Sequence, residues 1–132
     1  PVVCEPAAAK QRPQSEYDAE FSLPYFVAAC LVRGRFTLQE LEPESLGDPR
    51  ILDLCRRVRC EPDPLSEFPR YFSGSVEVEL RDGRRLARRE AINRGTDARP
   101  LSQSQIERKF FDNCERAIPR AQAQRVLEAV MA

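Results

Sequence analysis

The sequence predicts an α+β fold, in which a small, mostly antiparallel sheet is packed with helices and followed by C-terminal helices. Three observations lead to this prediction. Residues 21–34, FSLPYFVAACLVRG, form an almost unbroken apolar run of helical length. Residues 76–80 alternate apolar and acidic side chains before an Asp82-Gly83 turn signal, after which residues 84–91 return as a second strand. Residues 102–131 carry helix-capping signals and apolar stripes at helical spacing.

The apolar run is the predicted core helix. Ser22 is a favourable N-cap, Pro24 fits only the first turn, and Gly34 is a natural end. Residues 23–32 would span about 15 Å as a helix, which is too short to cross a bilayer. A helix that is apolar on all sides is expected to be buried on all sides. The alternative is that its first turn also faces a ligand.

The elements around this helix follow from shorter signals. Residues 1–4 read as a short edge strand, and Asp48-Pro49 opens a helix with a favoured cap followed by proline. Val58 and Cys60 alternate with charged residues, as in a strand with one buried face. We expect these strands to join the hairpin in one sheet, with the two helices covering one face.

The register of the hairpin has two candidate solutions. A two-residue loop places Glu77 opposite Arg88, and a three-residue loop places Glu77 opposite Arg89. We prefer the second, since it brings Leu80 level with Leu86 on one face. In either register glutamate lies opposite arginine, and we expect the hairpin arginines to be paired with carboxylates.

The C-terminal region is predicted to form two helices. Ser102 and Gln105 form a capping box for a helix that reaches about Arg116, and Pro119 begins the last helix. Phe111 lies off the apolar stripe of the first of these helices. It would contact either the last helix or a partner absent from the chain.

Composition excludes several classes of function. Lys+Arg and Asp+Glu are equal at 21 each, so we expect no nucleic-acid partner and no membrane partner. The chain has no histidine, no phosphate-binding glycine loop and no metal-ligand spacing, so we assign no catalytic residue and no metal site. The five cysteines are odd in number and form no CxxC pair. They indicate reduced thiols in a cytoplasmic protein.

Three stretches in order resemble the MmgE/PrpD family, which includes 2-methylcitrate dehydratase, cis-aconitate decarboxylase and iminodisuccinate epimerase. The first is YDAEFSLPY at residues 17–25, followed by Gly34. The second is the hairpin with its Arg81-Asp82-Gly83-Arg84 turn. The third is Gly95, then Pro100-Leu101-Ser102 and Lys109-Phe110. Together they cover nearly the whole chain.

The resemblance implies a particular division of the chain. Residues 1–100 would be the small α+β lid domain, and residues 101–132 would be a C-terminal helical segment returning to a helical domain that this chain lacks. The chain begins at Pro1 without a methionine, and we expect it to be part of a longer protein. Family members act on small di- or tricarboxylates in the cleft between the domains and need no cofactor. The parent would be a homo-oligomeric lyase or isomerase, and these residues alone would be inactive because the general base lies elsewhere.

The resemblance also supplies candidate substrate-binding residues, namely Glu20, Ser22 and Tyr25. Ser22 and Tyr25 match the family, although capping and core roles explain them equally well. Glu20 stands where the family often has lysine. The chain has Phe21 where decarboxylase-type members have histidine, and it lacks their tyrosine near Pro62. These departures argue against cis-aconitate decarboxylation.

A second hypothesis belongs to a different class of protein. The chain would be a non-catalytic interaction module that associates with itself through the helices of residues 100–132 or through an open sheet edge.

Overall fold

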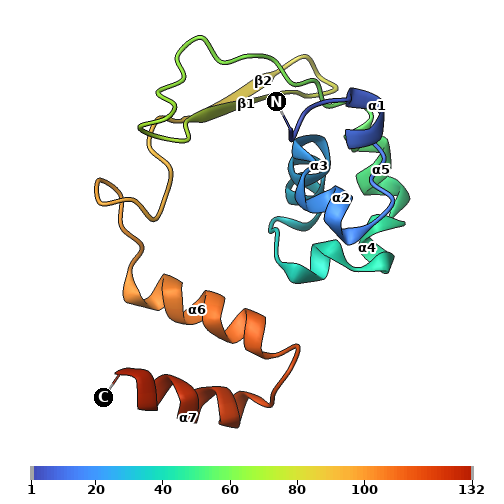
Figure 1. Cartoon of the computed structure of the whole chain (residues 1–132). Helices are drawn as coiled ribbons and strands as arrows, with labels where there is room; N and C mark the ends of the chain where they lie inside the picture. Colours follow the sequence, from blue (N-terminus) through green and yellow to red (C-terminus); the bar gives the residue numbers. More distant parts are fainter. Residues whose placement is uncertain (1, 132) are drawn as a thin grey trace. The chain divides into compact units, whose positions relative to one another are not determined.

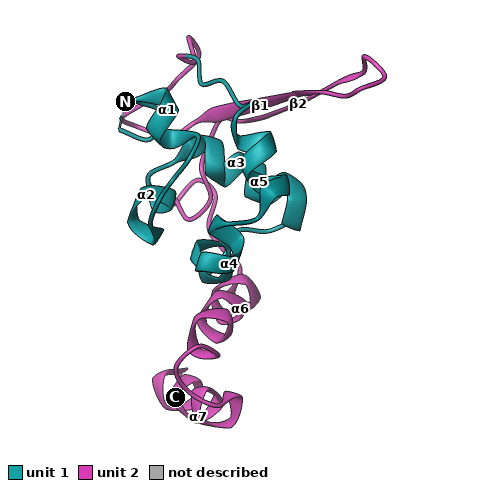
Figure 2. Cartoon of the chain, turned by 90° about the vertical axis from the view of Figure 1, so that its right-hand side faces the viewer, with its two compact units in different colours: residues 1–61 teal, residues 62–132 magenta. Residues whose placement is uncertain are grey.

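The computed structural model describes residues 2–131, and it confirms the α+β class (Figure 1). The chain divides into two compact units, residues 1–61 and residues 62–132 (Figure 2). The first unit is helical, and the second holds a two-stranded sheet and two helices. The predicted division at residue 100 into lid and returning helices stays a prediction.

The first unit is built around α3 (Leu23–Arg33), which packs against α5 (Pro49–Cys55). Short helices flank this pair: α1 (Ala7–Lys10), α2 (Glu16–Glu20), the 3-10 helix η1 (Leu38–Leu41) and α4 (Pro43–Leu46). Its buried apolar core consists of Ala19, Tyr25, Ala28, Ala29, Leu41, Ile51 and Cys55. The small alanines of α3 let the backbone of α5 approach closely.

The predicted helix boundaries in this unit are confirmed. The Ser22 side chain caps α3, Pro24 lies in the first turn, and Gly34 ends the helix at φ 72°. That left-handed conformation favours glycine. Asp48 caps α5, with Pro49 as the first helical residue. These signals succeed because each depends on hydrogen bonds within a few residues.

The prediction that α3 is buried on all sides is wrong. Leu23, Phe26 and Leu31 are 39–51% exposed, whereas Tyr25, Ala28 and Ala29 are fully buried. The buried positions fall on one stripe of the helix, where the core of the first unit covers it. A helix that is apolar on all sides is therefore not necessarily covered by other elements on all sides.

The predicted strands at residues 1–4 and near Val58 are also wrong within residues 2–131. Residues 2–4 form turns, and the Val3 carbonyl accepts a hydrogen bond from the Leu23 amide at 2.9 Å. The Val58 carbonyl accepts from the Gln11 side-chain amide at 3.0 Å instead of from a neighbouring strand. The apolar alternation was too short to define a strand, and Pro62 follows it closely.

The sheet of the second unit is the predicted hairpin, made of β1 (Gly74–Glu79) and β2 (Arg85–Glu90) in antiparallel order. Neither predicted register occurs, because Glu77 lies opposite Ala87 and Val78 opposite Leu86. The loop is three residues long but begins one residue earlier than expected. Gly83 has φ 85° and donates its amide to the Leu80 carbonyl, as in a turn followed by a bulge.

Four of the five hairpin arginines, Arg84, Arg85, Arg88 and Arg89, pair with carboxylates, as expected. Arg85 contacts Glu79 at 3.1 Å and Glu77 at 3.5 Å. Arg84 pairs with Asp82, and Arg88 and Arg99 pair with Glu90. Arg89 reaches the preceding loop, where it contacts the Asp63 carboxylate at 2.6 Å and the Leu65 carbonyl.

The second unit ends in α6 (Gln103–Cys114) and α7 (Arg120–Met131), which pack against each other. The Ser102–Gln105 capping box is present. Phe111 is buried, and the guanidinium of Arg120 lies 4.3 Å from its ring centre. The first alternative for Phe111, contact with the last helix, is therefore confirmed.

Candidate functional site

Ser22 lies at the N-terminus of α3 with both hydrogen-bonding functions of its hydroxyl satisfied. Its Oγ accepts from the Tyr25 amide at 3.0 Å and donates to the Lys10 carbonyl. The residue is 1% exposed. Ser22 therefore caps α3 and ties it to the end of α1, and its predicted contact with substrate stays a prediction.

Tyr25 points into the core of the first unit and is fully buried. Its hydroxyl donates to the Glu40 carbonyl at 2.6 Å. Burial, followed by the negative charge of Glu40, raises the pKa of Tyr25 to about 12. The phenol is therefore neutral at physiological pH and acts as a hydrogen-bond donor.

The carboxylate of Glu40 is the buried charge beside Tyr25. Burial alone raises the pKa of Glu40, but hydrogen bonds from the Thr37 amide and hydroxyl and from Arg35 outweigh it, so the pKa is lowered. The Thr37–Glu40 pair forms a complete capping box. Glu40 is thus an ionised structural group with its acceptor positions in use.

Glu20 differs from the other two predicted substrate-binding residues. It is exposed at the last position of α2, two residues before Ser22. The structure joins Ser22 and Tyr25 by a hydrogen bond and leaves Glu20 in solvent. Of the three residues, only Glu20 is exposed, and its role also stays a prediction.

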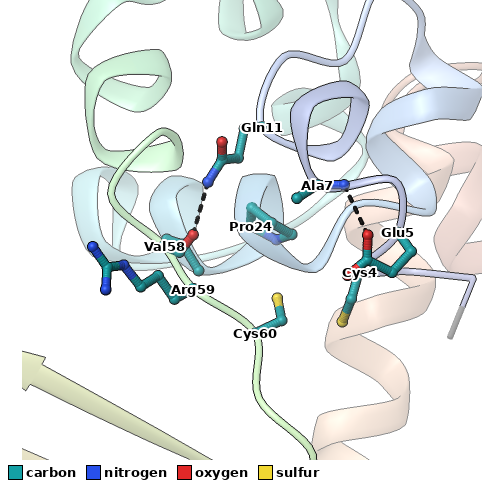
Figure 3. Close-up of a pocket in the computed structure, with 8 residues that line it drawn as sticks. All are labelled: Cys4, Glu5, Ala7, Gln11, Pro24, Val58, Arg59 and Cys60. Atoms are coloured by element: carbon teal, nitrogen blue, oxygen red, sulfur yellow. Dashed lines mark hydrogen bonds between the residues drawn. The ribbon is translucent and has the colours of Figure 1, made fainter.

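A pocket of about 180 Å³ lies beside the first turn of α3, within the first unit (Figure 3). It is lined by Cys4, Glu5, Ala7, Gln11, Pro24, Val58, Arg59 and Cys60. Gln11 holds one wall by donating to the Val58 and Arg56 carbonyls at 3.0 and 3.3 Å. Sequence reasoning missed this pocket, because its walls come from segments about fifty residues apart that share no motif.

Three thiols of the first unit, those of Cys30, Cys55 and Cys60, are poor nucleophiles. Burial raises the pKa of Cys55 to about 11 and also raises the pKa of Cys30. Burial and the adjacent Cys4 thiol raise the pKa of Cys60 to about 11. Across residues 2–131, no group of three or more His, Cys, Asp or Glu side chains is arranged to hold a metal ion.

Asp48 in the first unit is a carboxylate held by two arginines. It accepts hydrogen bonds from Arg50 and from Arg33, the latter at 3.0 Å. The side-chain hydrogen bond from Arg50 is the main reason that the pKa of Asp48 falls to about 2. Arg33 at the end of α3 and Arg50 in the first turn of α5 are thereby both paired with Asp48.

No helix within residues 2–131 has both the length and the apolar content needed to cross a membrane. Each buried side-chain nitrogen or oxygen in the same residues has a hydrogen-bond partner. The described core thus offers no unpaired polar group to a ligand, and any ligand contact would come from its surface.

Comparison with known proteins identifies relatives of the chain. Cis-aconitate decarboxylase of Mus musculus is 26% identical over 120 residues, which are 89% of this chain and 24% of that protein. Cis-aconitate decarboxylase of Homo sapiens is 30% identical over 108 residues, or 80% of this chain and 22% of that protein. Mitochondrial 2-methylcitrate dehydratase of Yarrowia lipolytica is 32% identical over 81 residues, which are 56% of this chain and 16% of that protein. The chain thus spans about a quarter or less of the length of these relatives.

A family model described as the MmgE/PrpD C-terminal domain matches residues 2–132. This match covers the helical first unit, the hairpin and the two final helices alike. The resemblance noted in the motifs is confirmed, and the chain belongs to the MmgE/PrpD family.

Proposed function

We propose that this domain is the C-terminal part of a lyase or isomerase that acts on small di- or tricarboxylates and that it forms the lid of the active-site cleft. The observation that carries the proposal is the family match across residues 2–132. The activities named for the relatives, a decarboxylase and a dehydratase, support a lyase. The parent would work without a cofactor and as a homo-oligomer.

The chemistry of the described residues supports a binding role more than a catalytic one. The sequence has no histidine, and the phenol of Tyr25 and the thiols of Cys55 and Cys60 have pKa values of about 11 to 12. None of these groups exchanges protons readily near neutral pH. The general base would therefore come from the remainder of the parent, and the lid would exclude water and position the substrate.

Glu20 is the residue that most directly tests substrate contact. It is exposed just before the N-terminus of α3, where its negative charge would repel a polycarboxylate. Glu20→Lys should lower KM for a carboxylate substrate if the residue faces the cleft. Glu16→Lys makes the same charge change one turn earlier in α2, also at an exposed position, and serves as the matched control.

The deciding experiment uses the full-length parent. It is supplied with 2-methylcitrate, citrate, cis-aconitate or iminodisuccinate while alkene absorbance and deuterium incorporation are followed by spectroscopy and NMR. We expect turnover of one substrate, which residues 1–132 alone do not support. A folded parent that neither turns over nor deuterates any of the four would reject the proposal.

A specific observation favours the second candidate, a self-association module. The final helices expose Ile106, Val126, Val130 and Met131. Apolar side chains gathered on such helices are typical of interaction surfaces. Light scattering across a concentration series tests this, since Val130→Glu should abolish a dimer formed through α7.

The five free thiols suit a reducing compartment, and we place the parent in the cytoplasm.

A further inference from the structure

Two cysteines that are far apart in the sequence meet at the pocket of the first unit. Cys4 and Cys60 both line it, and the Cys4 thiol lies close enough to contribute to the raised pKa of Cys60. Figure 3 shows both sulfur atoms at the same side of the pocket, below Pro24. Each residue is partly buried, and both are free thiols. Nothing in the proposed lid function uses this pair.

The neighbouring backbone holds the two cysteines in place. Next to Cys4, the Val3 carbonyl accepts from the Leu23 amide at 2.9 Å, which fixes the N-terminal segment against α3. Two residues before Cys60, the Val58 carbonyl accepts from Gln11 at 3.0 Å. The cysteines themselves lie in a turn and in an irregular segment. The backbone there can adjust to an S–S bond of about 2.05 Å without breaking a helix or strand.

We propose that Cys4 and Cys60 are an oxidisable thiol pair, which a small disulfide of the glutathione class converts to an intramolecular Cys4–Cys60 disulfide across the pocket. In the first step the Cys4 sulfur attacks the small disulfide, whose S–S bond breaks and releases one thiolate. In the second step the Cys60 sulfur attacks Cys4 in the mixed disulfide and expels the other thiolate. The two protein thiols lose two electrons and two protons, and the small disulfide becomes two thiols.

The surroundings of Cys60 determine the order of these steps. Burial is the largest cause that raises the pKa of Cys60 to about 11, so Cys60 is a poor attacking thiol and is assigned the second step. Its attack requires the thiolate, whose fraction rises about ten-fold per pH unit below that pKa. Closure should therefore be slow at pH 7 and about ten-fold faster at pH 8.

Burial raises the pKa of the other two cysteines of the first unit, Cys30 and Cys55, and makes them less reactive than an exposed thiol. Cys55 is buried and donates its thiol to the Lys10 carbonyl at 3.7 Å. Cys114 belongs to the second unit. A Cys4–Cys60 bond would enclose residues 4–60, which is nearly the whole first unit. Oxidation would thus cross-link this unit from end to end and leave α6 and α7 untouched.

Trypsin places the five cysteines on five different peptides, which makes the test direct. Cys4 lies before the cut at Lys10, and Cys60 lies on residues 60–70; the others fall on residues 11–33, 51–56 and 110–116. The full chain is incubated with oxidised and reduced glutathione, alkylated, digested and analysed by mass spectrometry. We expect the Cys4 and Cys60 peptides to be linked, at a yield at least about ten-fold higher in native protein than in 6 M guanidinium.

Matched variants distinguish a specific Cys4–Cys60 disulfide from random oxidation of the cysteines. Oxidation should raise the midpoint of thermal unfolding of the first unit, and a phosphine reductant should reverse the rise. Cys4→Ser should abolish the rise, and Cys114→Ser should retain it. Equal yields of all cysteine pairs, or equal linkage in native and denatured protein, would overturn the proposal. So would a rise in the midpoint that survives Cys4→Ser.

Discussion

The two units of the chain are stabilised by different kinds of interaction. The first buries a contiguous core from α2, α3, η1 and α5, with Tyr25 and Ile51 fully enclosed. Within residues 62–131, the buried apolar side chains are Phe111 and Ala123. The hairpin of the second unit instead exposes Val76 and Leu86 and is lined by ion pairs.

This difference shows where mutations should matter. Burial removes apolar area from water and contributes about 25 cal/mol per Å². Exposed ion pairs contribute about 0–1 kcal/mol each. The first unit should therefore be sensitive to the size of its core side chains, and the second to its turns and helix caps.

The largest effect should come from shortening the same side chain in both units. Ile51 is fully buried in α5, whereas Ile106 in α6 is 56% exposed. Ile51→Ala should destabilise the first unit by about 2–5 kcal/mol, because it removes buried methyl groups and leaves a cavity. Ile106→Ala should change the second unit by no more than about 0.5 kcal/mol. Urea titration with hydrogen-exchange mass spectrometry measures α5 and α6 separately, and equal losses would refute the comparison.

The next effect comes from removing a serine cap in each unit. Ser22 is buried and serves both the Tyr25 amide and the Lys10 carbonyl, whereas Ser102 is exposed. Ser22→Ala should cost about 1–3 kcal/mol, because two buried polar groups lose their partner. Ser102→Ala should cost about 0.5–1 kcal/mol, the usual loss of a cap. Amide exchange in the first turns of α3 and α6 measures both, and a larger loss at Ser102 would contradict the expected order.

Local signals in the sequence predicted much of this fold. The caps at Ser22, Asp48 and Ser102 were all found where the sequence placed them. Each depends on a side chain bonding an amide two or three residues away, so the sequence contains both partners.

Long-range features were not predictable in the same way. The hairpin register depended on whether Arg81 or Arg84 belongs to the loop, and alternation alone does not decide this. The exposure of Phe26 on α3 depends on which elements pack around that helix. The same holds for the site. Ser22 and Tyr25 lie at the start of α3, where the sequence predicted a helix to begin, and their contact with substrate stays a prediction. The pocket beside the first turn of α3 is formed by segments that the sequence did not connect.

Acid should affect the two units through different carboxylates. The pKa of Asp48 is lowered from 3.8 to about 2, chiefly by the side-chain hydrogen bond from Arg50. A lowered pKa stabilises the fold above pH 3.8, and this contribution is lost as the pH falls toward 2. In Asp48→Asn that acid dependence of α5 should disappear, since asparagine can still cap the helix.

Asp63 provides the corresponding test in the second unit. Its pKa is lowered mainly by the side-chain hydrogen bond from Arg89. Asp63→Asn should therefore reduce the acid dependence of β2 and leave that of α5 unchanged. Hydrogen exchange between pH 2 and 5, corrected for intrinsic rates, measures each. Unchanged acid dependence of α5 in Asp48→Asn would show that other carboxylates control it.

The smallest expected effect comes from replacing single arginines of the hairpin, and it should differ between exposed and partly buried ion pairs of the second unit. Arg85 is 68% exposed and contacts Glu77 and Glu79, whereas Arg89 is 31% exposed and contacts Asp63 and the Leu65 carbonyl. Arg85→Gln should change hairpin stability by less than about 0.5 kcal/mol, with the effect vanishing in 1 M salt, where the screening length is about 3 Å. Arg89→Gln should cost about 1 kcal/mol, because a partly buried carboxylate and a carbonyl both lose their donor. Amide exchange in β2 with and without salt measures both changes. Equal costs would mean that the hairpin depends on its surface charges as much as on the tie to the preceding loop.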